Sequence, residues 1–264
     1  MEVEGDELSP RKGGRTTYAK RRGDNSSGAH LPPVDQDAAA LSLAERYAPR
    51  IFLDQREPFL PVAVGYVIFT SDGYSPSVPR CIGLTPIGRR PAEFAIEYEI
   101  WWDWDIGHLY ELEHVWVYVG SDEVVGVEAS WHGGYFPWEP GKEVALEGDH
   151  PVLYAEPGKH AFFPQAAWFG ETRELVLKFC GPRAGTGGLM VSPLFERALA
   201  PYKTAEADAL IAEYLKRQAF EPSFVFDRPF TITRDILLPW PNLRDWIPKR
   251  VEWCLEQLRL HRGK

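Results

Sequence analysis

The chain has 264 residues with 38 acidic and 29 basic side chains, and a net charge of −9 argues against general nucleic-acid binding, which depends on a basic surface. Hydrophobic residues make up 44% and aromatic residues 13%, enough to bury a substantial core and favourable to β-structure, because rings pack well on pleated surfaces. With 23 glycines and 23 prolines, the composition predicts many turns and few long helices.

Residues 1–38 are rich in glycine, serine, proline and charge, with almost nothing apolar to bury, so they are predicted to form a disordered tail. The basic cluster at 20–22 could touch an anionic partner or could simply be solvated. Residues 39–264 are predicted to form a single domain.

The domain is expected to begin with a short helix over 38–48, which Pro49 ends. Runs of alternating hydrophobicity, separated by turn residues, then predict strands at 50–53, 62–69, 92–105, 111–119, 124–131, 152–154 and 175–180. Two amphipathic helices, 205–218 and 246–260, are predicted to end the chain. The fold class predicted from this order is mostly β: an antiparallel β-sandwich of jelly-roll type with peripheral and C-terminal helices.

The cysteines and the N-terminus predict a cellular compartment. Three widely spaced cysteines predict neither a disulfide framework nor a cysteine metal site. The first residues lack the basic start and apolar run of a signal peptide, and no stretch approaches the ~18 apolar residues that cross a bilayer. We therefore expect a soluble cytoplasmic protein without a transmembrane segment; its oligomeric state is left open.

Acidic and histidine side chains gather in residues 101–115, which we interpret as two strands joined by a turn. Because alternate side chains of a strand share a face, Asp103 and Asp105 lie on one face of the first strand. Glu111 and Glu113 share a face of the second strand with a run of valines, so both are expected to point into the mouth of the core.

Two inward carboxylates repel each other and lose solvation, so either their pKa values rise or a cation compensates them. We therefore predict a divalent-metal site with the ligands Asp103, Asp105, His108, Glu111 and Glu113. The many oxygen ligands favour Mg²⁺, Ca²⁺ or Mn²⁺, and the histidine leaves Zn²⁺ or Fe²⁺ open. The alternative is a solvated hairpin with rim charges.

Two further histidines follow predicted strands. His132 precedes the paired glycines 133–134, and His160 follows Gly158 and Lys159. Each is a candidate acid or base if it shares a cleft with the carboxylates, and each could instead be a hydrogen-bonded structural histidine. The sequence contains no nucleophile elbow, phosphate loop, dinucleotide fingerprint or His-Glu-x-x-His motif.

Several short motifs, in this order, resemble the vacuolar protein sorting sixty-two family. They are LAERYAP at 43–49, EPFLP at 57–61, HxxExEH at 108–114, HPVLY at 150–154, GKHA at 158–161 and a glycine-rich loop near Gly185, so the resemblance covers 43–190. A more distant similarity is to the necrosis- and ethylene-inducing-like proteins, whose GHRHDWE motif is echoed by residues 107–113.

The second family implies a β-sandwich whose motif helps to bind a divalent cation beside a head-group pocket. The resemblance implies the ligands Glu111, Glu113 and His108, with one of Asp103 or Asp105, and places His132 and His160 where those families have histidines. Tyr110 and Leu112 stand where a histidine and a tryptophan are expected. This departure argues against a toxin-like membrane activity.

Two functions follow from these observations. One is a divalent-metal-dependent enzyme of hydrolytic type that acts on a small molecule, glycan or lipid head group, with His132 or His160 as acid or base. The alternative is a non-catalytic, cation-dependent protein that binds a glycan or lipid head group; a purely structural metal is a third possibility. Trp101, Tyr110 and Trp131 are the candidate ligand-binding rings. The convergence of several histidines favours the enzyme.

Overall fold

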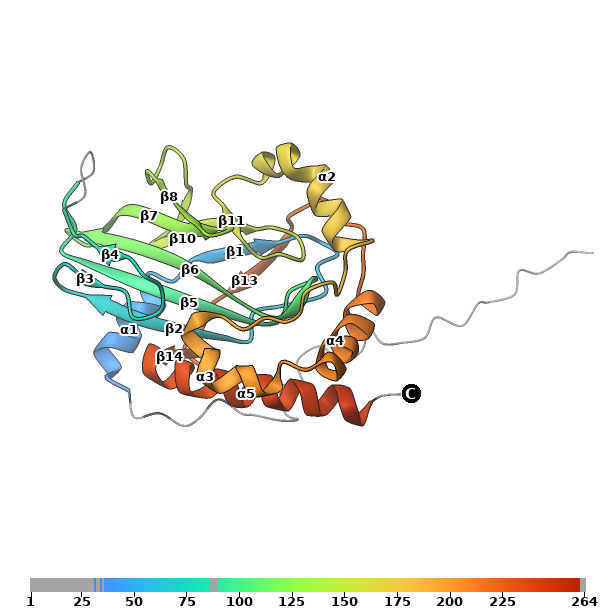
Figure 1. Ribbon diagram of the computed structural model, residues 1–264. Helices are drawn as coiled ribbons and strands as arrows, with labels where there is room; N and C mark the ends of the chain where they lie inside the picture. The colour runs from blue at the N-terminus through green and yellow to red at the C-terminus, as the bar shows by residue number, and fades with distance from the viewer. Residues whose placement is uncertain (1–30, 32–33, 35, 86–89, 262–264) are drawn as a thin grey trace, which may run out of the picture. The chain divides into compact units, whose positions relative to one another are not determined.

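The computed structural model describes residues 31, 34, 36–85 and 90–261 (Figure 1). Most of the predicted disordered tail lies outside the described residues, so that prediction stays open. Helix α1 (Ala38–Arg46) begins the domain, and the side chain of Asp37 caps it by accepting hydrogen bonds from the first backbone N–H groups. Among the described residues, no helix is both long and apolar enough to cross a membrane.

The larger of the described sheets has seven strands in the order β14-β2-β5-β6-β7-β8, with β12 beside β6. Their bounds are β2 (Ala63–Phe69), β5 (Phe94–Trp104), β6 (His108–Gly120), β7 (Glu123–Trp131), β8 (Gly134–Trp138), β12 (Gly188–Leu189) and β14 (Leu237–Pro239). The pairs from β2 through β8 are antiparallel, whereas β12 and β14 join in parallel. The long β5–β6 hairpin is the centre of this sheet.

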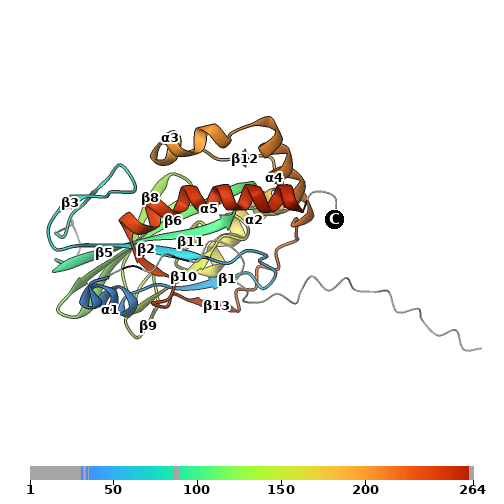
Figure 2. The ribbon, with the colours of Figure 1, turned by 90° about the horizontal axis from the view of Figure 1, so that it is seen from below.

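A second, five-stranded sheet has the order β11-β10-β1-β13, with β9 beside β10. Its strands are β1 (Arg50–Leu53), β9 (Leu146–Glu147), β10 (His150–Ala155), β11 (Phe162–Phe163) and β13 (Arg228–Thr231). Figures 1 and 2 show helix α5 (Trp240–Leu260) along one face of the larger sheet and strands β1, β10 and β13 on its other side.

The remaining helices follow the strands that carry the candidate site. They are η1 (Ala166–Trp168), α2 (Phe169–Cys180), η2 (Pro193–Phe195), α3 (Glu196–Leu199), η3 (Ala200–Tyr202) and α4 (Ala205–Arg217). The helices predicted near the C-terminus are confirmed as α4 and α5, although α5 begins earlier, at Trp240. The predicted strand 175–180 is wrong: this segment is the end of α2, where Phe169, Val176 and Cys180 are buried at helical spacing.

The two faces of β5 contact different partners. The ring of Trp102 stacks on His160, in the loop between β10 and β11, with ring centroids 4.6 Å apart. The ring of Trp101 instead meets Trp246 of α5 edge-on at 6.3 Å. Alternation along the strand therefore separates an inner face, toward the smaller sheet, from a face covered by α5.

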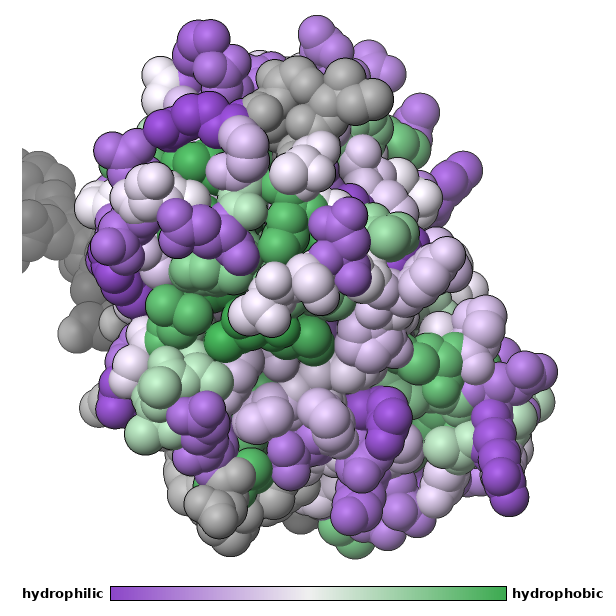
Figure 3. Space-filling model, turned by 90° about the vertical axis from the view of Figure 1, so that its left-hand side faces the viewer, coloured by the Kyte–Doolittle hydropathy of each residue, from purple (hydrophilic) through white to green (hydrophobic). Residues whose placement is uncertain are grey.

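The segment with β3 (Gly73–Tyr74) and β4 (Cys81–Ile82) covers another part of the larger sheet. It closes a buried cluster of Phe69, Ile82, Leu84, Ala95, Trp116, Tyr118 and Val125. The hydroxyls of Ser75 and Ser77 both donate hydrogen bonds to Oε1 of Glu97, a fully buried carboxylate on β5. On this side of the molecule, hydrophobic residues form a band bordered by hydrophilic ones (Figure 3).

The chain is thus sheet-rich with several helices, as the sequence predicts. Both larger sheets are open, and their strand orders combine antiparallel with parallel pairs. The finer prediction of a β-sandwich of jelly-roll type is not established by this arrangement and stays a prediction.

Candidate functional site

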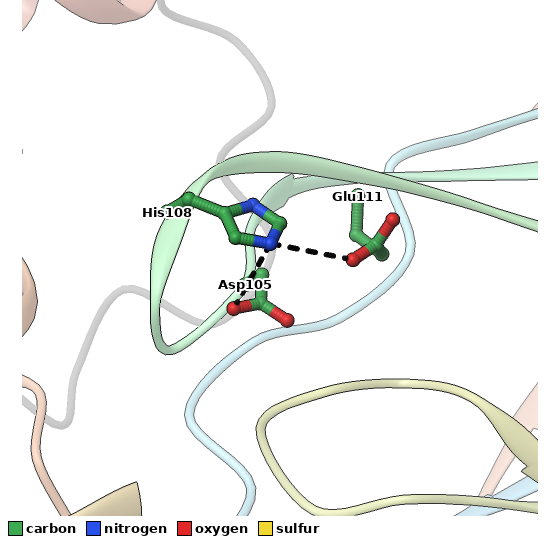
Figure 4. Close-up of side chains that lie close together, drawn as sticks. All are labelled: Asp105, His108 and Glu111. Carbon is green, nitrogen blue, oxygen red and sulfur yellow. Dashed lines mark ion pairs between the residues drawn. The ribbon is translucent and has the colours of Figure 1, made fainter. Parts of the chain in front are cut away.

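The turn between β5 and β6 brings three potential metal ligands together. One ligand atom from each of Asp105, His108 and Glu111 lies within 4.8 Å of the others. Nε2 of His108 is 3.6 Å from Oδ1 of Asp105 and 3.7 Å from Oε2 of Glu111 (Figure 4). The imidazole therefore lies between two carboxylates at the end of the hairpin.

The orientation of His108 is fixed by its other ring nitrogen. Nδ1 lies 2.9 Å from the backbone oxygen of Tyr110, and because a carbonyl oxygen can only accept, Nδ1 must carry the proton. In the neutral ring, Nε2 then presents a lone pair toward Asp105 and Glu111. Tyr110 has φ of 60°, a left-handed conformation that is uncommon for a residue other than glycine.

Asp105 is fully buried and has two charge-compensating contacts. Oδ1 accepts a hydrogen bond from the backbone N of Gly107 at 2.5 Å, and Oδ2 lies 2.6 Å from Nζ of Lys159. Burial lowers the pKa of Lys159, but the carboxylates of Asp105 and Glu111 act more strongly together, so its pKa is raised. A cationic side chain thus already lies against this acidic turn.

The loop after β10 delivers Lys159 to the turn. Gly158 donates its N–H to Oε2 of Glu57 at 2.7 Å, and its oxygen accepts from the N–H of Ile106 at 2.7 Å. Gly158 has φ of 70°, and a Cβ there would lie 2.9 Å from both Cys180 Sγ and Ile106 Cγ2. Only glycine fits this close approach between the two sheets.

Glu113 extends the cluster inward along β6. Its Oε2 accepts a hydrogen bond from the hydroxyl of Ser130 on β7. Burial first, and then the charge of Glu111, raise the pKa of Glu113 well above its usual range. Both predicted inward-facing carboxylates are therefore on the inner side of the sheet, but Glu113 is engaged by a serine rather than by the His108 group.

His132 lies at the end of β7 and forms a pair with Glu156. Its Nε2 is 2.7 Å from Oε2 of Glu156, whose side chain is only 1% exposed. The hydrogen bond that His132 donates to Glu156 raises the pKa of His132 against the opposing effect of burial. Glu111 also raises this pKa and Lys159 lowers it, so the pair is electrostatically coupled to the acidic turn.

The second candidate acid or base, His160, lies in the interior. Its side chain is fully buried, it stacks on Trp102, and its Nε2 is 3.4 Å from Oε1 of Glu57. A ring enclosed in this way is out of reach of a substrate that approaches from solvent.

Asp103 is not brought together with the other predicted ligands. It faces α5, where Nε and Nη2 of Arg250 contact its two oxygens at 3.0 and 2.8 Å. Trp101 Nε1 donates to the same carboxylate at 3.0 Å. Strand β5 ends at Trp104, so Asp105 belongs to the turn and leaves the face that Asp103 occupies.

The three predicted ligand-binding rings separate in the same way. Trp101 and Tyr110 are buried and stacked at 4.7 Å, with Trp246 against Trp101, so they form core on the α5 side. Trp131 alone is partly exposed, stacked on Phe163 at 3.8 Å and beside the ring of His132.

Sequence reasoning did not single out Lys159, Glu156 or Ser130 as members of the cluster. Glu156 and Lys159 lie in the same short loop as His160, so the signal was the density of charged residues after a predicted strand. Ser130 had no signal of its own in the sequence.

Neither a protein-family model nor a curated protein sequence matches the chain. A solved structure titled "NLPPya in complex with glucosamine" is similar over 53% of this chain and 73% of that one, with 19% identity and a TM-score of 0.36. Necrosis and Ethylene inducing Protein 2 from the causal agent of cocoa's Witches Broom disease is similar over 54% and 74%, with 20% identity and a TM-score of 0.33. Similarities this weak carry no argument about function, and the resemblance to the vacuolar protein sorting sixty-two family stays a prediction.

Proposed function

We propose that Asp105, His108 and Glu111 hold one divalent cation, and that the protein is a metal-dependent enzyme of hydrolytic type acting on a small molecule, glycan or lipid head group. The observation that carries this proposal is the orientation of His108. Its Nδ1 is committed to the Tyr110 carbonyl, so the neutral ring points a lone pair at two carboxylates. While the ring is neutral, this lone pair and the two carboxylates repel one another unless a cation lies between them.

The spacing of the donors fits a small cation. Ligands about 2.0–2.2 Å from an ion in tetrahedral or octahedral geometry lie roughly 3.0–3.5 Å apart. The separations of 3.6 and 3.7 Å around His108 slightly exceed this range, and the three ligand atoms lie within 4.8 Å of one another, so the side chains would move inward around the ion. Two carboxylates with one imidazole suit Mg²⁺, Ca²⁺ or Mn²⁺, and the nitrogen donor keeps Zn²⁺ or Fe²⁺ open.

Glu113 and Lys159 have supporting roles in this proposal. Glu113 adds a carboxylate on the same face of β6 as Glu111, one alternation further inward. Lys159 neutralises Oδ2 of Asp105, which leaves the other oxygen directed toward His108. The cluster can therefore bind a dication without burying a large excess of negative charge.

A bound divalent cation would polarise a substrate oxygen and lower the pKa of a water molecule. In this chain His132 is the group suited to proton transfer, because it is partly exposed and Glu156 stabilises its protonated form. During hydrolysis it would donate its proton to the leaving-group oxygen and regain one from the attacking water. We assign His160 and Asp103 to positioning, since both are buried and engaged by protein partners.

The alternative function is cation-dependent binding of a glycan or lipid head group without catalysis. The observation that favours it is the partly exposed Trp131 beside His132, because an aromatic surface can hold a ligand without any chemistry. A screen of esters, phosphoesters and glycosides separates the two functions, since a binder turns over none of them.

The test of the hydrolase is His132→Gln, with His261→Gln as the matched control on an exposed histidine at the end of α5. We expect turnover to fall by roughly 10²-fold or more in His132→Gln, the usual scale of general acid–base catalysis, with the metal content unchanged. Full turnover in His132→Gln would contradict the assigned role. If the wild type hydrolyses none of the screened substrates, the binding function is favoured instead.

A further inference from the structure

An aromatic groove lies beside the proposed active site. It has a volume of about 420 Å³ and brings together the end of β7, strand β8, strand β11 and the start of α2. Its aromatic lining consists of Trp131, Phe136, Trp138, Phe163 and Trp168. The rings of Trp131 and His132 are nearly perpendicular, with centroids 4.8 Å apart, so the groove begins next to the His132–Glu156 pair.

The rings form walls at different angles. Trp131 and Phe163 are nearly parallel, with an interplanar angle of 12°, whereas Trp168 meets Phe163 at 71° with centroids 5.5 Å apart. Trp168 is 37% exposed and Phe136 is 46% exposed, so these two rings are open to a ligand. A hollow with aromatic walls at several angles suits a compact, rounded group more than a flat or extended one.

Among the described residues, the one charged residue in the lining of the groove is acidic. Glu171, in the first turn of α2, lines it, and within the described part of the chain Glu171 makes no ion pair.

The cation–π contacts among the described residues involve rings outside the groove. Arg80 covers Trp116 and Tyr135, and Arg250 covers Trp253, for example. Among the described residues, no Lys or Arg lies over any ring of the groove. The groove therefore combines the exposed rings of Trp168 and Phe136 with a carboxylate, that of Glu171, for which no ion pair is found among the described residues, and both features attract a positive charge.

We propose that this groove binds a quaternary or methylated ammonium group. Such a group is rounded, weakly hydrated and cationic, so the ring faces can contact its methyl groups while Glu171 offsets its charge. An acyl chain would match the rings but not the carboxylate. The inference rests on the proposed function in one respect: it names the substrate class of the hydrolase as molecules with a quaternary ammonium group, whose remainder would lie beside His132.

The experiment compares choline with 3,3-dimethylbutan-1-ol, in which a neutral carbon replaces the nitrogen. Calorimetric titration of the full chain in buffer with a metal chelator keeps the groove separate from the metal site. We expect choline to bind at least about tenfold more tightly than the neutral alcohol, because only choline has a charge for the rings and Glu171. Equal binding of both compounds, or no binding of choline, would overturn the proposal.

Variants locate the binding in the groove. Trp168→Ala and Glu171→Gln, both at exposed positions, are expected to weaken choline by about tenfold and several-fold respectively. Tyr74→Ala and Glu174→Gln are the matched controls, at exposed positions outside the groove, and should bind choline like wild type. Unchanged choline binding in Trp168→Ala would also overturn the proposal. So would glucosamine that displaces choline and binds as tightly as choline does.

The same variants distinguish the two claims. Trp168→Ala should bind divalent cations as wild type does, because the groove and the acidic turn use different residues. If choline binds and no divalent metal ion does, the groove proposal stands and the proposed metal-dependent function fails. If divalent metal ions bind and choline does not, the proposed function stands and the groove proposal fails.

Discussion

Nε2 of His132 lies 2.7 Å from Oε2 of Glu156, so a partly exposed imidazole is held by a carboxylate that is almost completely buried. His132 adopts φ of 45°, which turns the residue out of β7 toward the loop that carries Glu156. The pair joins the larger sheet to the smaller one at the place where the acidic turn also meets that loop.

This pair predicts a pH dependence of stability. The pKa of His132 is raised in the folded protein, chiefly by Glu156; burial and Lys159 act to lower it, and Glu111 acts weakly to raise it. Its stabilisation is therefore fully present below the unfolded pKa of about 6.5 and is lost as the pH rises through the folded pKa. In urea unfolding, the difference between wild type and His132→Gln should be largest near pH 6 and smaller at pH 9. A difference that grows with pH would contradict this account.

Glu99 predicts the opposite pH dependence. It lies on the α5-facing side of β5, and both of its carboxylate oxygens are buried. Burial, followed by the charge of Glu97, raises its pKa well above the usual value. A raised carboxyl pKa destabilises the folded state increasingly as the pH rises above the unfolded pKa of about 4.3.

Glu99→Gln should therefore be more stable than wild type at pH 8 and similar to it at pH 4. The difference in the free energy of unfolding should grow by up to about 1.4 kcal/mol per pH unit between the unfolded and folded pKa values. Glu174→Gln, at an exposed position on α2, is the control and should follow wild type at both pH values. A variant that loses stability at pH 8 would show that Glu99 is needed in its charged form.

The buried ion pair of Asp103 and Arg250 is expected to stabilise the packing of α5 on the larger sheet. Arg250→Ala leaves Asp103 charged and buried against Trp101, so the free energy of unfolding should fall by about 3–5 kcal/mol. Arg259→Ala, an exposed position on the same helix, should change it by less than about 1 kcal/mol. Equal effects of the two substitutions in urea unfolding would mean that the buried pair does not hold the helix.

The β5–β6 hairpin shows how far the sequence alone predicts the candidate site. The alternation of apolar and charged residues predicts both strands, the turn between them and the inward direction of Glu111 and Glu113. It does not separate Asp103 from Asp105, because the strand ends at Trp104 and alternation has no meaning beyond that point. The left-handed backbone of Tyr110, which orients His108, likewise leaves no trace in the residue pattern.

The second half of the site comes from the other sheet. Glu156 and Lys159 reach the acidic turn only because β10 pairs in parallel with β1 and its loop packs on Ile106. Such contacts between distant segments have no local signal in one sequence. The same limit explains segment 175–180, whose short apolar run fits a strand or a buried helix until its packing partners are known.

The central claim is that Asp105, His108 and Glu111 bind a divalent cation, and calorimetric titration with Mg²⁺, Ca²⁺, Mn²⁺ and Zn²⁺ tests it most directly. Wild type should bind one equivalent of at least one of these ions, and Glu111→Gln should bind it at least about tenfold more weakly, because a neutral amide does not offset the dehydration of the cation. Glu174→Gln should bind like wild type. The claim is contradicted if wild type binds none of the four ions, or if Glu111→Gln binds them as tightly as wild type does.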